Sequence, residues 1–173
     1  MALSKIDVAN FLTGTIPQGN VANASLGAVT ALPAAIPTGK VLQVSNFVQA
    51  SSAQTFSSTS YADLTNVTVN ITPSATSSKI LILSNIGSDL NDGEGYGMQF
   101  VRGSSSIYAT KTLYTLYSEG VTQVYNVNMF NYYDSPNSTS QQTYKVQIRS
   151  YNNASINIST SYNSNIQVME IAG

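Results

Sequence analysis

Few residues of this chain could do chemistry, because the sequence contains no Cys and no His. Their absence excludes thiol nucleophiles, disulfides, Ser-His-Asp triads, imidazole metal ligands and histidine pH switches. Only 8 Asp and Glu residues remain for carboxylate chemistry. The composition therefore argues against an enzyme, and we expect a non-enzymatic protein without a cofactor, apart from the structural calcium considered next.

The densest group of carboxylates lies in residues 88–96, which contain Asp89, Asp92 and Glu94. Carboxylate oxygens are ligands that Ca²⁺ accepts, so these three residues are a candidate structural calcium site. The spacing is not that of an EF-hand loop, and the alternative is a solvated hairpin turn with Asp92 and Gly93 at its tip. A glycosidase pair of Asp92 and Glu94 is a further alternative, but such a pair must face a cleft from opposite sides of the glycosidic bond, and the surrounding sequence does not indicate such a cleft.

Tyrosine is the second chemical feature, since the chain has 11 Tyr against 5 Phe and no Trp. Tyr108, Tyr114 and Tyr117 lie in or beside residues 109–120, an aromatic and polar segment without clear periodicity. A phenol ring combines an apolar face with a hydrogen-bonding group, which suits a hydroxyl-rich ligand or a protein surface. We predict that these three tyrosines bind a receptor; the alternative is that they pack in the core with their hydroxyl groups at its rim.

Charge is scarce: 9% of the residues are charged and the formal net charge is −1, whereas a typical soluble domain has about 25% charged residues. Such a chain has no cationic field to attract nucleic acid. No apolar run approaches the ~20 residues that span a membrane, and the first residues lack the pattern of a secretory signal. We therefore expect folding in a cytoplasm, no nucleic-acid partner and no membrane insertion.

Residues 1–39 differ from the rest of the chain. Gly and Pro recur through 14–39 with Ala, Val and Leu between them, which prevents a long helix and weakens any central strand. We predict an extended arm that lies against another surface. The residues predicted to attach this arm are Leu3, Ile6, Phe11 and Leu12.

Residues 40–173 are predicted to form one β domain. The predicted strands are 40–49, 54–61, 66–71, 79–86, 96–102, 106–110, 121–133, 142–151, 154–159 and 165–171. Turn-forming residues separate these strands, for example at Asp92-Gly93 and at 134–137. Short strands at this spacing predict an all-β antiparallel sandwich of the jelly-roll type.

Several predicted strands carry apolar side chains on both faces. In 121–133, Tyr125 and Met129 lie on one face, and Phe130 and Tyr132 lie on the other. A strand that is buried on both sides is hard to accommodate in a small sandwich, so burial of the second face between copies of the chain is the simplest solution. The alternative is that these strands are central in their sheets.

Six segments of the chain act as landmarks. They are Ala31–Val44, Thr72–Ile82, Val101–Tyr108, Tyr133–Pro136, Thr143–Gln147 and Val168–Ile171. In these landmarks the chain resembles small virion fibre proteins of marine and cyanobacterial tailed bacteriophages. The resemblance implies a trimeric β-sandwich at the end of a tail or head fibre, and none of the landmarks is a catalytic motif.

We therefore expect a structural protein of the virion, a homotrimer of the tail-fibre type that assembles in the host cytoplasm. Residues 1–39 would attach to other virion proteins of the tail or capsid, and 40–173 would contact glycans or proteins of the host surface. One alternative is a capsid decoration, cement or head-fibre protein that stabilises or studs the shell. Another is a glycan-cleaving depolymerase, which would need the pair of Asp92 and Glu94.

Overall fold

The structure, a computed structural model, describes residues 40–45, 48–50, 52–110, 114–159 and 161–173. The predicted arm and its attachment residues Leu3, Ile6, Phe11 and Leu12 lie outside the described residues. Within the described ranges the chain forms strands joined by turns and irregular segments, and no helix there is long and apolar enough to cross a membrane.

The strands form two antiparallel sheets, here called sheet A and sheet B. Sheet A contains β1 (Val41–Val44), β2 (Val48–Gln49), β3 (Gln54–Phe56), β5 (Lys79–Asn91), β9 (Gln123–Asp134), β11 (Ile156–Ile158) and β12 (Asn165–Ile171). Sheet B contains β4 (Ala62–Ile71), β6 (Gly95–Arg102), β7 (Ser105–Ala109), β8 (Leu116–Tyr117) and β10 (Gln142–Ser150).

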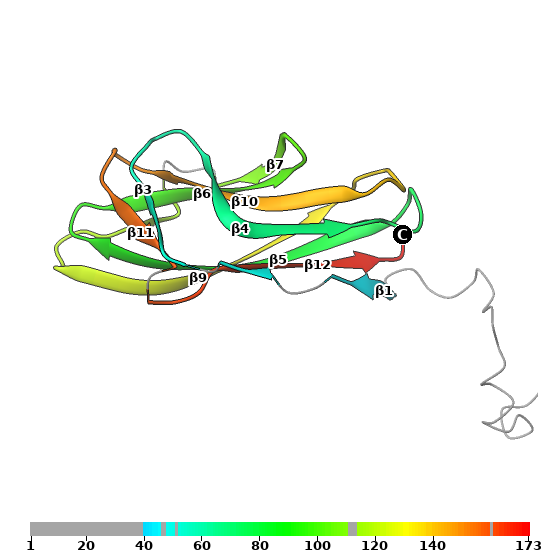
Figure 1. Cartoon of the computed structure of the whole chain (residues 1–173), viewed down its shortest axis with the longest axis horizontal. Coiled ribbons are helices and arrows are strands. Elements are labelled where there is room, and N and C mark those ends of the chain that lie inside the picture. The colour runs from blue at the N-terminus through cyan, green and yellow to red at the C-terminus, as the bar shows by residue number, and fades with distance from the viewer. Residues whose placement is uncertain (1–39, 46–47, 51, 111–113, 160) are drawn as a thin grey trace, which may run out of the picture. The chain divides into compact units, whose positions relative to one another are not determined.

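The strand order confirms the predicted jelly-roll-like sandwich. In sheet A, β5 pairs with β9 along one edge and with β12 along the other, and β1 follows β12. Sheet B has the order β4, β10, β6, β7. Figure 1 shows sheet B as the upper layer and β9, β5, β12 and β1 in the lower layer. The chain passes repeatedly from one sheet to the other, as it does in a jelly roll.

Most predicted strands are present, with two instructive differences. The segment 88–91, which we predicted as part of a polar loop, instead extends β5 to Asn91, because β9 and β11 pair with it there. The strand predicted at 66–71 begins at Ala62 and carries an irregularity at Asn66, whose φ of 64° is left-handed. Asn tolerates this conformation better than most residues, so a strand can pass through it.

One apolar core lies between the sheets. Alternate residues of β5 point inward, and Ile80, Ile82 and Ile86 are fully buried. From sheet B, the largest buried side chains are Tyr96 and Tyr144. Period-two alternation places these residues on the inner face and leaves their neighbours in the sequence on the outer face.

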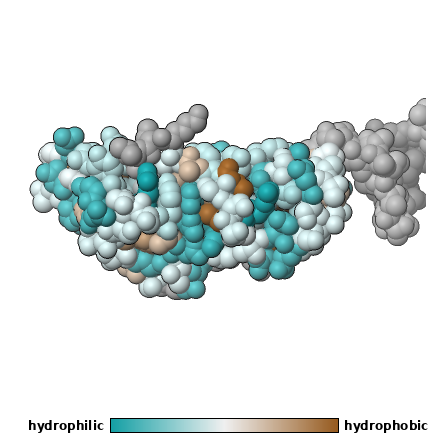
Figure 2. Space-filling view, turned by 90° about the horizontal axis from the view of Figure 1, so that it is seen from above, coloured by the Kyte–Doolittle hydropathy of each residue, from teal (hydrophilic) through white to brown (hydrophobic). Residues whose placement is uncertain are grey.

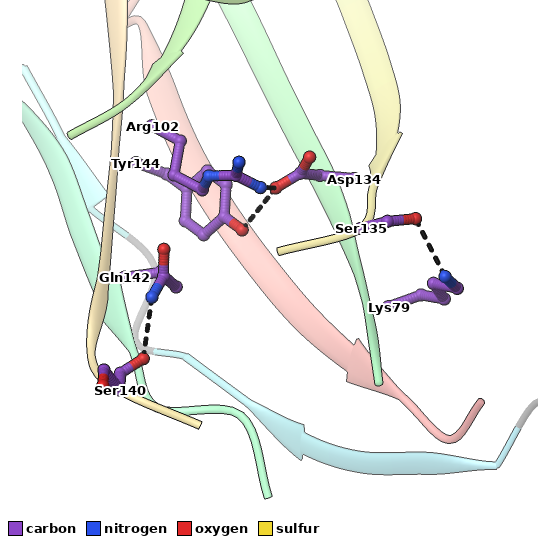
Figure 3. A network of polar contacts seen from close by, with 7 residues as sticks. All are labelled: Lys79, Arg102, Asp134, Ser135, Ser140, Gln142 and Tyr144. Carbon is purple, nitrogen blue, oxygen red and sulfur yellow. Dashed lines mark hydrogen bonds and ion pairs between the residues drawn. The ribbon is translucent and has the colours of Figure 1, made fainter. Parts of the chain in front are cut away.

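A partly buried ion pair joins the two sheets. Arg102 of β6 donates a hydrogen bond from Nη1 to Asp134 Oδ2 of β9 over 2.7 Å. The Tyr144 hydroxyl of β10 donates to the same oxygen, also over 2.7 Å. Figure 3 shows both side chains pointing at the carboxylate of Asp134. Because Asp134 belongs to sheet A and its two partners belong to sheet B, the contact holds the layers together.

A second carboxylate, Glu170 of β12, is also buried. It accepts hydrogen bonds from the backbone N–H and hydroxyl of Ser74 and from Gln43 Nε2. Burial alone would raise the pKa of Glu170, but the hydrogen bonds from Ser74, Ser78 and Gln43 outweigh it and hold the pKa below its ordinary value of 4.5.

We predict that Tyr144→Phe destabilises the fold without changing it. The substitution keeps the ring in the core but removes a hydrogen bond to an ionised, buried carboxylate, which costs about 1.5–3 kcal/mol in the free energy of unfolding. Chemical denaturation followed by circular dichroism measures this loss. As a control, Tyr133→Phe on the exposed outer face should change stability by no more than about 0.5 kcal/mol; equal effects of the two variants would contradict the assigned role of Tyr144.

We also predict that acidification destabilises the protein partly through Glu170. Its pKa is lower in the folded state than in the unfolded chain, so the stabilisation is present above about pH 4.5 and is lost as the pH falls further. Denaturation midpoints measured between pH 7 and pH 3 should fall less steeply for Glu170→Gln than for the unmodified chain. Glu119→Gln, at an exposed position, should retain the full acid sensitivity, and an unchanged slope in Glu170→Gln would exclude this explanation.

Candidate functional site

Three tyrosines form an aromatic cluster, here called the tyrosine platform: Tyr114, Tyr117 and Tyr151. The ring centroids of Tyr114 and Tyr117 are 5.1 Å apart with planes inclined by 32°. Tyr151 stands edge-on to both rings, at 5.1 Å from Tyr114 and 5.5 Å from Tyr117. The Tyr114 residue is 38% exposed and the other two are half-buried. Rings arranged in this way support one another and leave apolar surface in contact with solvent.

Gly95 is the reason that these segments can approach one another. Tyr117 of β8 pairs with Gly95 of β6, and the Tyr151 N–H donates to the Gly95 carbonyl oxygen over 2.8 Å. A Cβ atom at Gly95 would lie 2.8 Å from the Leu116 carbonyl oxygen and 3.0 Å from Tyr117 Cδ2. The absence of a side chain there lets β8 and the end of β10 meet above β6.

The turn between β5 and β6 forms the border of the tyrosine platform. Asp92 Oδ1 accepts a hydrogen bond of 2.7 Å from the Gly120 N–H, and Asn152 Nδ2 donates to the Gly93 carbonyl oxygen over 2.9 Å. Glu94 accepts from the backbone and side chain of Asn91. The predicted hairpin turn at Asp92-Gly93 is therefore present, and its carboxylates help to hold it.

The electrostatic environment of the platform is negative at Tyr117. Partial desolvation raises the pKa of the Tyr117 phenol, and the carboxylates of Glu119 and Asp92 raise it further. A phenol hydroxyl such as that of Tyr117 can donate a hydrogen bond to a ligand.

Tyr108 lies apart from the platform, beside the open edge of the sandwich. Its ring packs between Phe100, at 5.9 Å, and Tyr132, at 5.4 Å. A hollow of about 630 Å³ that is wide open to solvent lies here. The residues that line the hollow are Ile107, Tyr108, Ala109, Thr110, Tyr114, Thr115 and Tyr132. Tyr114 therefore borders both the hollow and the platform.

The predicted receptor residues are thus divided between two neighbouring places. The structure brings Tyr114 and Tyr117 together, sets Tyr108 in the hollow, and adds Tyr151, which sequence reasoning missed. A signal for Tyr151 was present, because it continues the outward alternation of Lys145, Gln147 and Arg149 beyond the end of β10.

The predicted calcium ligands are not brought together. Asp89 lies on β5, where its Oδ2 accepts a hydrogen bond from the Ser161 hydroxyl, while Asp92 and Glu94 are engaged in the turn. No group of three or more acidic side chains in the described ranges could hold a metal ion. The reason is the extension of β5 through Asp89, which turns its side chain to the outer face of sheet A and away from the turn.

The two outer faces of the sandwich differ in chemistry. On sheet B, Lys145 pairs with Asp63 over 2.7 Å, and the Arg149 guanidinium lies 4.9 Å from the Tyr61 ring centroid. Figure 2 views this side, which is coloured mainly teal and white with a few brown areas. Polar and aromatic groups therefore dominate the outer surface of sheet B.

The outer face of sheet A carries a group of apolar side chains, which we call the apolar face. Its members are Val41, Val44, Leu81, Leu83, Tyr125, Val127, Met129, Tyr133, Met169 and Ile171, which the strand registers place on one side of the sheet. The same registers place Lys79, Asn85, Asn131 and Gln167 among them. Met129 is 81% exposed, Tyr133 53% and Tyr125 52%. Among the described strands, β9 is hydrogen-bonded to β5 alone, so these side chains lie on a sheet edge.

Neither a protein-family model nor a curated protein matches this chain. Two solved structures of infectious bursal disease virus are similar in fold. The VP2 subviral particle has 12% sequence identity and a TM-score of 0.49, covering 78% of this chain and 34% of that one. The structure of the Gx strain has 12% identity and a TM-score of 0.45, covering 77% and 33%. The chain thus spans about a third of the length of the chains it matches.

Proposed function

We propose that this chain is a non-enzymatic structural protein of a tailed bacteriophage virion, a homotrimer of the tail-fibre type that adheres to the host surface. The observation that carries the proposal is the apolar face of sheet A. The landmark segments that resemble small phage fibre proteins support it from the sequence. In this proposal residues 1–39 attach the protein to the particle, and 40–173 form the exposed sandwich.

The apolar face is suited to contact between copies of the chain. Val127, Met129 and Tyr133 alternate along one strand and are largely exposed in a single chain. An exposed edge strand with apolar residues invites pairing with another chain, and proteins usually protect such an edge with charges or proline. Residues 123–133 contain neither. Self-association covers this surface without any crosslink, which suits a sequence without cysteine.

A charge placed on the apolar face should therefore prevent assembly. We predict that the full chain is trimeric at micromolar concentration and that Met129→Lys converts it to monomer, because burying an unpaired ammonium group is strongly unfavourable. Size-exclusion chromatography with light scattering measures both masses. The matched control is Ser104→Lys, at an exposed position between β6 and β7, which should remain trimeric.

Two results would overturn this part of the proposal. An unmodified chain that is monomeric at micromolar concentration would contradict the proposed homotrimer. A Met129→Lys variant that assembles as well as Ser104→Lys would show that the apolar face is not the contact surface.

The tyrosine platform is the proposed adhesion site. Phenol rings stack on the apolar faces of sugar rings, while their hydroxyl groups and neighbouring amides such as Asn152 hydrogen-bond to sugar hydroxyls. Such a site on an exposed surface binds weakly, but a trimer presents three copies, and avidity raises the overall affinity. Asp92 and Glu94 serve the turn in this proposal and do no catalysis.

Removing the platform should remove adhesion. We predict that the double variant Tyr114→Ala, Tyr151→Ala binds intact cells of a cyanobacterial panel at least about tenfold more weakly than the unmodified trimer, since aromatic anchors dominate binding energy. Flow cytometry with labelled protein measures the binding. Tyr162→Ala, which removes an exposed tyrosine from the loop after β11, is the control and should bind normally.

Equal binding by the double variant and the control would show that adhesion uses another surface. If the unmodified trimer bound none of the cells, the adhesion role itself would be wrong. Gold labelling of Ser4→Cys on intact particles then distinguishes the remaining roles: label on the tail agrees with a fibre, and label on the head indicates a decoration or cement protein.

A further inference from the structure

The tyrosine platform lies next to carboxylates on a surface that otherwise has few charges. Asp92 and Glu119 are both exposed. Glu119 follows Tyr117 by two residues, and Asp92 is hydrogen-bonded to the next residue, Gly120. The bond from Gly120 N–H engages Asp92 Oδ1, which leaves Oδ2 as an acceptor. The Gly93 N–H also donates to the Ser118 carbonyl oxygen over 2.9 Å, so the turn that carries Asp92 lies against the segment that carries Tyr117 and Glu119.

We propose that the tyrosine platform is selective for neutral and cationic sugars, such as neutral hexoses, N-acetylhexosamines and hexosamines, and rejects sugars that carry a carboxylate. This inference rests on the proposed adhesion function and adds the chemical class of the ligand. Asp92 and Glu119 are its specificity-determining residues, and the rings supply affinity that does not depend on charge.

The chemistry of the three classes of sugar predicts that cationic sugars bind most tightly, neutral sugars less tightly and sugars with a carboxylate most weakly. A sugar hydroxyl group can donate a hydrogen bond to the Asp92 or Glu119 carboxylate, and a sugar ammonium group forms a stronger, charge-assisted one. A uronic acid keeps hydroxyl groups that can donate, but its carboxylate can only accept, so this group is repelled by the two like charges and gains no hydrogen bond from them. Burial is the largest cause of the raised pKa of Tyr117, and both carboxylates raise it in the same direction.

The platform also explains why the discrimination concerns charge rather than shape. Tyr114 and Tyr117 offer two ring faces inclined by only 32°, with the edge of Tyr151 against them. Stacking on such rings tolerates many sugars, because it requires only an apolar face on the ligand. Tyr114 also borders the hollow that contains Tyr108, so a longer saccharide can continue from the platform into that hollow.

The test uses the full-length trimer and two matched pairs of hexasaccharides in low-salt buffer. The first pair is hexagalacturonate and its fully methyl-esterified form, which differ in carboxylate charge and in the ester methyl groups; the salt dependence isolates the part due to charge. The second pair is the hexamer of N-acetylglucosamine and the hexamer of glucosamine. Isothermal titration calorimetry measures the dissociation constants. We expect the methyl ester to bind about tenfold more tightly than hexagalacturonate, the glucosamine hexamer to bind at least as tightly as its acetylated form, and both differences to shrink with added salt.

Variants assign the effect to the carboxylates. Glu119→Gln should narrow the ratio between the methyl ester and hexagalacturonate to about threefold or less, and Asp92→Asn should do the same. The matched control is Asp63→Asn, which removes one negative charge from the outer face of sheet B at the pair with Lys145. Its ratio should equal that of the unmodified trimer, and a ratio reduced as much as in Glu119→Gln would mean that net charge alone is responsible and would overturn the assignment.

The outcomes separate the two proposals. Hexagalacturonate that binds as tightly as its methyl ester overturns the selectivity and leaves the adhesion function standing. If the unmodified trimer binds none of the four hexasaccharides, both the selectivity and glycan adhesion by the platform are wrong.

Discussion

One apolar core, filled from both sheets, determines where every outward side chain of this protein lies. The strand β5 is hydrogen-bonded along both edges, to β9 on one side and to β12 and β11 on the other. Its inward residues Ile80, Ile82 and Ile86 are fully buried. A slip of one residue would exchange the inward and outward sets in β5 and in its neighbours. The requirement to bury the core therefore sets the register of strand pairing. That register determines which side chains lie on each outer face.

The two outer faces have different consequences. The face of sheet B can stand in water, because charged, amide and phenol groups cover it. The face of sheet A cannot do so without cost, because Met129 and its neighbours expose apolar surface along a sheet edge. A protein without disulfides must draw its stability from burial, and contact between copies adds burial that a single sandwich lacks. One face would then assemble the protein while the other remains available for a ligand.

The scarcity of charge gives the remaining charges more influence. The chain has 7 basic and 8 acidic residues, and some of the acidic residues are buried. Asp134 and Glu170 are buried with hydrogen-bond partners. Burial raises the pKa of Tyr117 at the tyrosine platform, and Glu119 and Asp92 raise it further. A chain with a formal net charge of only −1 therefore still carries two exposed carboxylates close to this group of rings.

The sequence by itself determined the fold class, most strands, the hairpin turn at Asp92-Gly93 and the apolar second face of 121–133, because alternation and turn residues are local properties. Only the tertiary structure decided which side chains meet. Asp89 left the predicted calcium group because pairing with β9 and β11 extended β5 through it. Tyr151 joined Tyr114 and Tyr117 because Gly95 lets two segments distant in sequence approach above β6. Such proximity arises from strand pairing between remote segments, which no local pattern of residues encodes.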